Sequence, residues 1–391
     1  MAASSARSLV PDSDIKTACS EGFYDMIKTE GIKYAGSKRK FLSRILDLIG
    51  RTKSKTVLDG FSGSTRVSQA LAQTGFQVAA NDVAVWSKIL ATCYLKNQKQ
   101  PRDYNSLIEH LNAVHPEDGW FTEHYGGQPN DGKSVQADGF KKPWQIHNTR
   151  KLDAVRDEID RLNLDEVDKA VAITSLMLAL DEVDSTLGHF VSYLADWSPR
   201  SYKTMKLRIP HVFPNDESHL VLQGDIFDSI KGRSFDLAYF DPPYGSNNEK
   251  MPPSRVRYAS YYHVWTSVCL NDKPNLFGKS RRRMDTSDTE SVSIFEEFRR
   301  DENGQFIAVD AIDRLIRMVN ARYVLLSYSS GGRATADELA EVLKKNGDLL
   351  ESVEIDYKKN VMADMKWTNE WIHNVEKPNR EFLFLIEKKA S

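Results

Sequence analysis

The chain has 391 residues, of which 40% are hydrophobic and 28% are charged, and its formal net charge at pH 7 is -2. This length fits one large α/β domain with an insertion, or two domains, and the composition excludes a largely disordered, collagen-like or disulfide-stapled chain. The near-neutral charge argues against a globally basic nucleic-acid binder, although local basic patches remain compatible with it.

The sequence shows no sign of export or membrane insertion. Its longest apolar-rich stretch, residues 170–180, is too short to cross a bilayer, and its first residues lack the apolar core of a secretory signal. The three cysteines lie at unrelated spacings, which suggests neither a disulfide framework nor a zinc site. We therefore expect a cytoplasmic protein without a membrane partner, in which residues 1–30 form a flexible leader.

Two strand-loop-helix units are predicted after this leader. In chain order, the predicted elements are a helix beginning after Ser37, a strand over 56–58, a helix ending at Gly75, a strand over 76–80 and a helix over 86–94. Two such units in series predict a parallel, doubly wound sheet.

This alternation stops near Pro101, and residues 101–219 are interpreted as a mostly helical inserted domain. Strands resume at 220–223 and 235–240, each apolar enough to be buried on both faces of a parallel sheet. We therefore assign residues 31–100 and 220–391 to the core domain. Further predicted elements are helices over 148–162, 165–181, 307–319 and 336–345 and strands over 323–328, 349–357 and 381–386.

Asp241-Pro242-Pro243-Tyr244 directly follows the apolar strand 235–240. Ligands of open parallel sheets bind beyond the carboxyl ends of the strands, so chemistry is expected here. The prolines fix the backbone and leave the Pro242 carbonyl beside the Asp241 carboxylate as a rigid pair of acceptors. Such a pair suits a substrate with an exocyclic NH2 whose lone pair must be freed from the ring, and Tyr244 offers a flat face for stacking.

The turn over residues 59–64, with the sequence DGFSGS, is a weaker signal, because a glycine-rich loop that opens a helix can hold any nucleotide or be a simple turn. It lacks the P-loop lysine and the full dinucleotide fingerprint, which lowers the case for ATP or NAD. Asp82 closes the second strand and can accept both hydroxyls of a ribose, so an adenosine-containing cofactor is expected. The ring of Phe61 is suited to lie near a cationic sulfonium.

Taken together and in order, these motifs resemble the Dam-like, D12 class of adenine-specific DNA methyltransferases. The resemblance rests on Lys33-Tyr34-Ala35-Gly36-Ser37-Lys38, Asp59-Gly60-Phe61-Ser62-Gly63, Asn81-Asp82, and Gly224-Asp225-Ile226-Phe227 ahead of Asp241-Pro242-Pro243-Tyr244. One departure is Ser64-Thr65, where many relatives carry further small residues or glycine. The resemblance implies an α/β, doubly wound S-adenosylmethionine-dependent methyltransferase fold with a helical insertion. It also implies direct methyl transfer from S-adenosylmethionine to N6 of a flipped-out adenine, with no metal.

The resemblance further implies residue roles. Lys33 and the turn 34–36 would hold the methionine end of the cofactor, and the loop 61–63 would pass beneath it. Asp82 would bind the ribose, and Asp225 or Ile226 the adenine. The expected cofactor contacts are Lys33, Tyr34, Ala35, Gly36, Asp59, Phe61, Ser62, Gly63, Asp82, Val83, Asp225, Ile226 and Asp241, and the expected catalytic residues are Asp241, Pro242, Pro243 and Tyr244.

Two basic runs, 199–210 and 279–283, are candidate contacts to DNA phosphates, with solvated surface charge as the alternative. A loop after the catalytic tetrapeptide is placed to touch the flanks of an extruded nucleotide. The insertion 101–219 is expected to recognise the target sequence. The candidate nucleic-acid contacts are Lys203, Arg208, Asn248, Arg255, Arg281, Arg282 and Arg283.

The large insertion favours double-stranded DNA as substrate. The resemblance favours a restriction-modification or phage-defence setting, with a cognate restriction endonuclease as a partner, and an orphan regulator is the alternative. Two alternatives remain open, an RNA adenine methyltransferase and a DNA-binding module that has lost catalysis. A serine at position 241 would have indicated cytosine N4 and an asparagine a protein glutamine, and Asp241 disfavours both. His263 has no second ligand at a suitable spacing and is expected to be structural.

Overall fold

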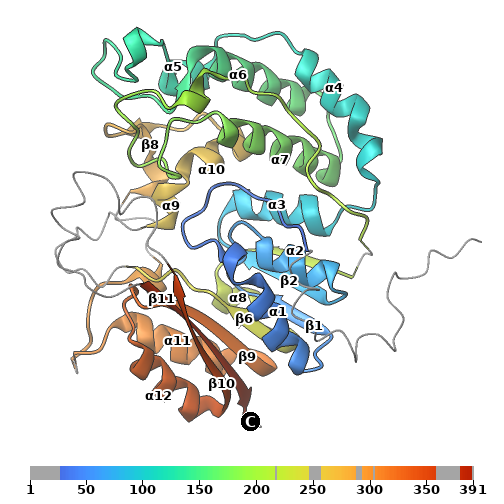
Figure 1. Ribbon diagram of the computed structural model, residues 1–391, viewed down its shortest axis with the longest axis vertical. Helices are drawn as coiled ribbons and strands as arrows, with labels where there is room; N and C mark the ends of the chain where they lie inside the picture. Colours follow the sequence, from blue (N-terminus) through green and yellow to red (C-terminus); the bar gives the residue numbers. More distant parts are fainter. Residues whose placement is uncertain are drawn as a thin grey trace, which may run out of the picture.

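The structure is a computed structural model of the chain, and it describes residues 27–215, 218–245, 257–287, 293–302, 304–357 and 379–389. These residues form a lower lobe built on a sheet and an upper lobe of helices (Figure 1). Most of the predicted leader, residues 1–26, lies outside the described residues. Across the ranges that are described, no helix combines the length and the apolar character needed to span a membrane.

The lower lobe contains a seven-stranded sheet in the order β10-β11-β9-β6-β1-β2-β5. Its strands are β1 (Thr56–Asp59), β2 (Gln77–Asp82), β5 (Leu220–Gln223), β6 (Ser234–Phe240), β9 (Asn320–Ser329), β10 (Gly347–Tyr357) and β11 (Asn379–Lys388). All neighbouring pairs from β5 to β9 are parallel, whereas β11 runs antiparallel between β9 and β10. The first residues of β11 therefore lie at the edge where the parallel strands end.

Helices cover both faces of this sheet. One face packs against α1 (Leu42–Arg51) and α2 (Arg66–Gln73), and the other against α8 (Ile226–Ser229), α11 (Ile307–Met318) and α12 (Ala336–Asn346). Side chains alternate between the two cores, since Val57 belongs to the first and its neighbour Leu58 to the second. The predicted doubly wound α/β architecture is confirmed.

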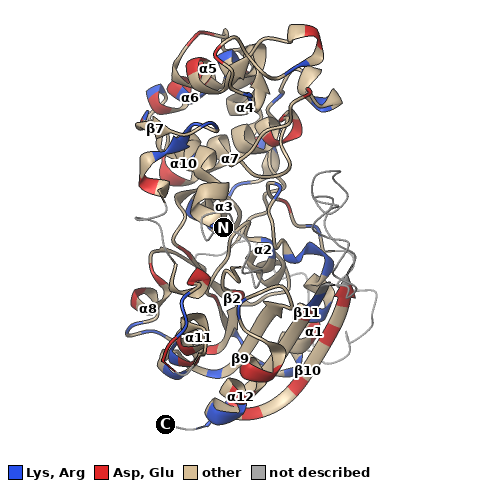
Figure 2. Cartoon of the chain, turned by 90° about the vertical axis from the view of Figure 1, so that its left-hand side faces the viewer, with Lys and Arg blue, Asp and Glu red and all other residues tan. Residues whose placement is uncertain are grey.

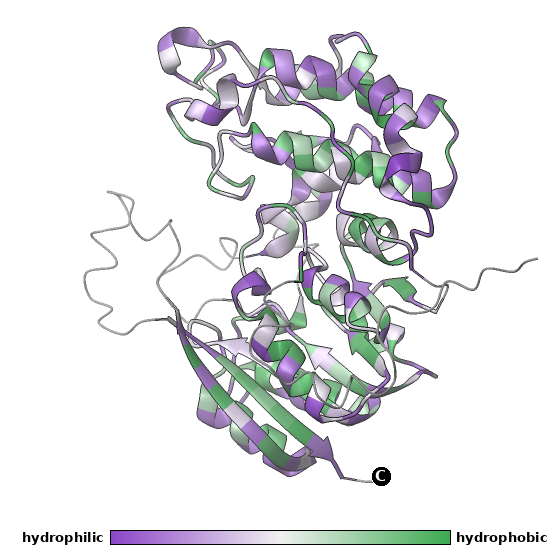
Figure 3. Cartoon of the chain, turned by 45° about the vertical axis from the view of Figure 1, so that its right-hand side comes forward, coloured by the Kyte–Doolittle hydropathy of each residue, from purple (hydrophilic) through white to green (hydrophobic). Residues whose placement is uncertain are grey.

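The upper lobe has its own hydrophobic core. Its helices are α4 (Asn105–Ala113), α5 (Trp120–Tyr125), α6 (Ile146–Arg161), α7 (Glu166–Glu182), α9 (Tyr258–Tyr261) and α10 (His263–Leu270). Helix α3 (Val85–Leu95) joins the lobes, because Leu90 lies in the upper core and Leu95 in the core beside the sheet. Figure 3 shows hydrophobic residues both on the strands of the lower lobe and on the helices of the upper lobe.

Residues 257–287 belong to the upper lobe, although the sequence analysis assigned them to the core domain. Tyr262 and Trp265 are buried in the upper core together with residues of α6 and α7. Arg156 on α6, which is 1% exposed, binds the chain near the end of α10: its Nε donates to the Val268 carbonyl at 2.6 Å and its Nη2 to the Cys269 carbonyl at 3.0 Å. The helical lobe is therefore assembled from two separate segments.

The outer edge strand β10 is lined with carboxylates, as Figure 2 shows. Asp348, Glu354 and Asp356 are exposed on it, and Glu351 is half-buried. Charged side chains on an edge strand discourage pairing with the sheet of another molecule. The opposite edge, β5, has only four residues.

Candidate active site

A cavity of about 380 Å³ lies beyond the carboxyl ends of β1, β2 and β6. Each of these strands brings one acid to it: Asp59 and Asp82 are the last residues of β1 and β2, and Asp241 follows β6. Of the expected site residues, the cavity is lined by Tyr34, Gly36, Asp59, Phe61, Ser62, Asp82, Val83, Asp225, Ile226, Asp241, Pro242, Pro243 and Tyr244.

The loop between β1 and α2 requires its glycines. A Cβ at Gly60 would lie 2.7 Å from ring carbons of Phe240, so only glycine allows this close approach. Gly63 has φ +45°, and a Cβ there would lie 2.9 Å from the Tyr34 ring. The Gly63 amide donates to Asp82 Oδ2 at 2.9 Å, which ties the loop to the end of β2.

Asp82 is half-buried and presents its carboxylate to the cavity. Its Oδ1 accepts the Ala84 amide at 2.9 Å, and burial raises its pKa while these backbone donors oppose the rise. Val83 beside it is 68% exposed. Just beyond the end of the neighbouring strand β5, Asp225 caps α8 by accepting the Phe227 amide at 2.8 Å. Asp82 and Val83 thus place an acid beside an apolar side chain, which suits a ligand that carries hydroxyls next to a flat ring.

Asp59 lies deeper and is 1% exposed. Its Oδ2 accepts Ser68 Oγ at 2.6 Å, whereas its Oδ1 has no hydrogen-bond partner among the described residues. Burial raises its pKa to about 7. A buried carboxylate oxygen without a donor is costly, so a ligand that brings a cationic N–H group to this end of the cavity would satisfy it.

Asp241 and Tyr244 are joined by two residues that the sequence analysis did not single out, Lys38 and Glu381. The Lys38 ammonium lies 3.1 Å from Asp241 Oδ1 and 2.9 Å from Glu381 Oε1, and it also donates to the Tyr244 hydroxyl. Burial lowers the pKa of Lys38, but the two carboxylates outweigh this and hold it above its usual value. Burial raises the pKa of Asp241 to about 6, while the Lys38 charge opposes the rise.

Tyr244 is fixed by the same group of residues. Its hydroxyl donates to Asp241 Oδ1 and lies 3.1 Å from Glu381 Oε1. The Lys38 ammonium lies 4.9 Å from the centroid of its ring, and Tyr328 meets the ring edge-on at 4.7 Å. Lys38 stands inside the motif 33–38 and could have been found from it, but nothing in the sequence around Glu381 marks that residue.

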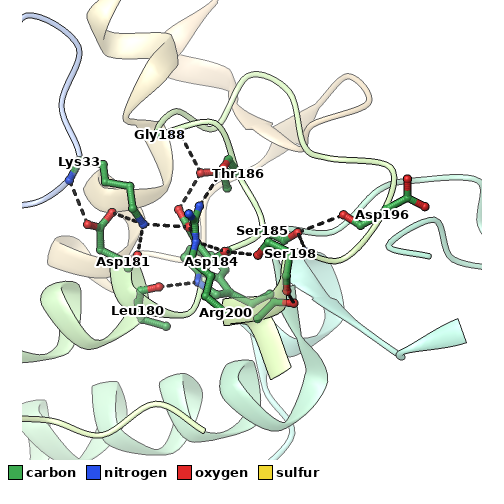
Figure 4. A network of polar contacts seen from close by, with 12 residues as sticks. Lys33, Leu180, Asp181, Asp184, Ser185, Thr186, Gly188, Asp196, Ser198 and Arg200 are labelled. Atoms are coloured by element: carbon green, nitrogen blue, oxygen red, sulfur yellow. Dashed lines mark hydrogen bonds and ion pairs between the residues drawn. The ribbon is translucent and has the colours of Figure 1, made fainter. Parts of the chain in front are cut away.

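Lys33 does not line the cavity, in contrast to its expected role. Its Nζ lies 3.0 Å from Asp184 Oδ1 and 3.6 Å from Asp181 Oδ1, and its amide donates to Asp181 Oδ2 at 3.0 Å. Figure 4 shows these contacts, in which Arg200 approaches Asp184 from the opposite side. Lys33 and Arg200 thus attach the N-terminal segment and the start of the first basic run to the upper lobe. Ala35 is also outside the cavity lining, and its amide donates to the Tyr262 hydroxyl at 2.6 Å.

The candidate nucleic-acid contacts Lys203 and Arg208 differ in their surroundings. Lys203 is exposed, whereas Arg208 pairs with Glu30 at 2.5 Å and with Glu182 at 3.3 Å. Asn248 and Arg255 lie outside the described residues. His263 is fully buried with Nε2 3.1 Å from the Phe190 carbonyl, which agrees with a structural role.

The basic run 279–283 has an internal role at one end. Arg283 is 3% exposed and pairs with Asp272 and with Asp285, each at 2.7 Å, so the prediction that it contacts phosphate is corrected. Arg282 is partly buried and donates to Ser260 Oγ at 2.5 Å. Arg281 lies with its guanidinium 4.5 Å from the centroid of the Phe140 ring and 4.0 Å from an Asp138 oxygen. A charge run does not reveal which of its members face inward.

We predict that Arg283→Ala destabilises the fold by about 2 kcal/mol, because it leaves two carboxylates without their cation. Urea denaturation measures this loss. Arg281→Ala is the matched control and should change stability little while flattening the salt dependence of DNA binding by up to about 0.9 in log-log slope. If Arg283→Ala instead left stability unchanged and flattened the slope, the phosphate role would be restored to it.

The chain is similar to known DNA methyltransferases. The family model of the D12 class N6 adenine-specific DNA methyltransferases matches residues 34–290. The chain is 24% identical over 332 residues to the modification methylase StsI of Streptococcus sanguinis, an alignment that covers 80% of this chain and 46% of that protein. It is 25% identical over 362 residues to the type II methyltransferase M.NlaIII of Neisseria lactamica, which covers 88% and 99% respectively.

The chain thus spans less than half the length of the first relative and nearly all of the second. Among solved structures, a class I S-adenosylmethionine-dependent methyltransferase from Listeria monocytogenes aligns with 90% of this chain and 59% of its own, with a TM-score of 0.32 and 9% identity.

Proposed function

Because the chain belongs to the D12 class of N6 adenine-specific DNA methyltransferases, we propose that it transfers a methyl group from S-adenosylmethionine to N6 of an adenine in DNA. The observation that carries this proposal is the cavity lined by Asp82, Asp59 and Asp241, which lie at the carboxyl ends of three neighbouring parallel strands. A ribose, a cationic amino acid group and an amino-substituted base are the chemical groups that these three acids suit.

The residues fit S-adenosylmethionine. Asp82 would accept the ribose hydroxyls, and Val83 and Ile226 would border the adenine. The unpartnered Oδ1 of Asp59 would accept a hydrogen bond from the ammonium of the methionine end. The sequence analysis gave the methionine end as a whole to Lys33 and the turn 34–36. When bound, S-adenosylmethionine supplies an electrophilic methyl group on a cationic sulfur. The remaining proposed contacts are Tyr34, Gly36, Phe61, Ser62, Gly63 and Asp225.

The chain itself positions the acceptor. Asp241 and the Pro242 carbonyl accept hydrogen bonds from the exocyclic amino group, which withdraws its lone pair from conjugation with the ring. Tyr244 stacks on the base. Because burial makes Asp241 more basic than a solvent-exposed aspartate, it is a better acceptor for the developing positive charge on the nitrogen. Positioning and electrostatics thus provide the rate enhancement.

DNA recognition is proposed for the upper lobe, with residues 101–219 as the main reader of the target sequence. The exposed Lys203 and the half-exposed Arg281 are candidate phosphate contacts there. The named relatives are a modification methylase and a type II methyltransferase. These names support the proposal that the protein acts in a restriction-modification or phage-defence setting, with a cognate endonuclease that cleaves unmethylated DNA as its partner.

The test is transfer of tritiated methyl groups to double-stranded DNA, with an RNA of the same sequence in parallel. Incorporation into the DNA that maps to N6 of adenine at one recurrent sequence is the expected result. Incorporation into RNA alone would support the RNA methyltransferase, and binding of DNA without incorporation would support the silent module.

We predict that Asp82→Ala weakens S-adenosylmethionine binding by roughly 1.5 to 3 kcal/mol, about 10- to 150-fold in Kd, because a charged acceptor for the ribose is lost. Calorimetry without DNA measures it. Asp241→Ala serves as the comparison, since it removes the acceptor from the other end of the cavity and should scarcely change Kd. Equal binding by the two variants would contradict the assignment of Asp82.

A further inference from the structure

Glu381 does not line the cavity but contacts Lys38 and Tyr244, which do, although it is far from every sequence motif of the family. It belongs to β11, beyond the residues 34–290 that match the family model. Because β11 is antiparallel to β9, with Glu381 opposite Ser329, its first residues return to the edge of the sheet where Asp241 leaves β6. The C-terminal strand therefore completes the site.

The Glu381 side chain is held firmly. It is 2% exposed, and Oε1 accepts Ser327 Oγ at 2.6 Å in addition to its contact with Lys38 at 2.9 Å. Ser327 comes from β9, the neighbouring strand. With Asp241 at 3.1 Å and the Tyr244 hydroxyl as its third acceptor, all three N–H donors of the Lys38 ammonium have partners.

The charges decide what this arrangement does. Lys38 alone beside Asp241 would form a simple ion pair, which makes a carboxylate a weaker base. Glu381 shares the same ammonium and adds a second negative charge near Asp241, so the attraction of Lys38 for Asp241 is partly compensated. Asp241 thereby keeps its place in the site and remains a strong acceptor.

We propose that Glu381 is a positioning residue, which holds the Lys38 ammonium against Asp241 and Tyr244 and shares its charge, so that Asp241 can accept the amino group of the substrate. This inference rests on the proposed function for its catalytic meaning. The physical claim about these four side chains is independent of that function and can be tested without it.

Asp241 is faced by groups from several elements. Lys38 approaches from the turn before α1, Glu381 from β11, and Tyr244 from the chain after β6. The other titratable groups that act on it are Asp59 at the end of β1, Tyr239 on β6, Tyr258 on α9 and Tyr34. Lys38 is the cation among these groups. A change at Glu381 therefore alters the net electrostatic effect of the Lys38 charge on the Asp241 carboxylate.

The experiment is a 13C NMR titration of protein labelled at the aspartate carboxyl carbons, with Asp241→Asn to identify the Asp241 signal. In Glu381→Gln, which keeps the shape and the acceptor oxygen but removes the charge, Asp241 should titrate about one pH unit lower than in the unchanged protein. In Lys38→Gln it should titrate higher. Glu387→Gln is the matched control: Glu387 lies on the same strand, pairs with Arg322 at 2.8 Å, and should leave Asp241 unchanged.

Methyl transfer in the same proteins gives the second readout. Glu381→Gln should lower kcat by about tenfold at pH 8 while the acid limb of its pH profile moves to lower pH, a combination that general damage to the fold would not produce. Glu381→Ala should lose more, since Lys38 also loses an acceptor. Binding of S-adenosylmethionine should stay within about twofold in both.

The outcomes are separable. If Asp241 titrates at the same pH in Glu381→Gln, Glu387→Gln and the unchanged protein, the inference is overturned. If Glu381→Gln does not fold, Lys38→Gln provides the test. The inference is also overturned if Asp241 titrates no higher in Lys38→Gln than in the unchanged protein. If the titrations shift as expected but the unchanged protein methylates no DNA, the proposed function fails and the arrangement around Lys38 stands.

Discussion

Replacing Asp241 with alanine should reduce methyl transfer to DNA at least a hundredfold in kcat, which corresponds to about 2.7 kcal/mol of transition-state stabilisation. In this variant the adenine amino group has no charged acceptor, so its lone pair stays conjugated with the ring and is no longer aligned with the methyl group. Lys38 keeps Glu381 as its partner at 2.9 Å, and the protein should remain folded. Tritiated methyl incorporation measures the loss.

Asp241→Asn refines this experiment, because it keeps the shape of the side chain and one acceptor oxygen but removes the charge. We expect it to lose less activity than Asp241→Ala, in proportion to what the carboxylate charge contributes. If Asp241→Ala retained activity within tenfold of the unchanged protein, the tetrapeptide 241–244 would have a structural role and the proposed mechanism would be abandoned.

The second large effect is expected on stability, from Asp184→Ala. Asp184 is 1% exposed and holds Lys33 at 3.0 Å and Arg200 at 2.6 Å, so its removal leaves two cations without their shared carboxylate. Breaking such a pair costs about 3 kcal/mol, and for a chain of this length the melting temperature should fall by on the order of 4 °C. Calorimetry or thermal melting checks this.

Asp196→Ala is the matched control, because Asp196 belongs to the same part of the upper lobe but its side chain is 70% exposed where it pairs with Lys133. Its loss should cost less than about 1 kcal/mol. Equal destabilisation by both variants would show that the contacts in Figure 4 contribute no more than surface ion pairs do.

Local patterns predicted most of the individual elements. The apolar spacing after Ser37 predicted the helix that is α1, and the apolar run 235–240 predicted β6, because the first pattern marks one buried face of a helix and the second marks a strand buried on both faces. The same periodicity does not say against which core an element packs. The residues that form α10 were therefore assigned with 220–391 to the core domain, although Trp265 lies in the core of the upper lobe.

Site residues that belong to a sequence motif were predicted. A residue that reaches the site only through the chain topology was missed. Asp59, Asp82 and Asp241 each end or follow a strand, so a parallel sheet alone brings them to one edge. Glu381 reaches that edge only because β11 is antiparallel, and strand direction is not encoded in an apolar pattern. The inward direction of Arg283 could not be known either, because a run of basic residues does not show which of its members is buried.

The place of β11 in the sheet also affects the order in which the protein is completed during synthesis. Strand β10 emerges from the ribosome before β11, yet within the described sheet it is hydrogen-bonded only to β11. A nascent chain that ends before residue 379 therefore has no strand to connect β10 to β9 and no Glu381 beside Lys38. The growing polypeptide therefore joins β10 to the rest of the seven-stranded sheet and places Glu381 beside Lys38 in the same step, when β11 is inserted.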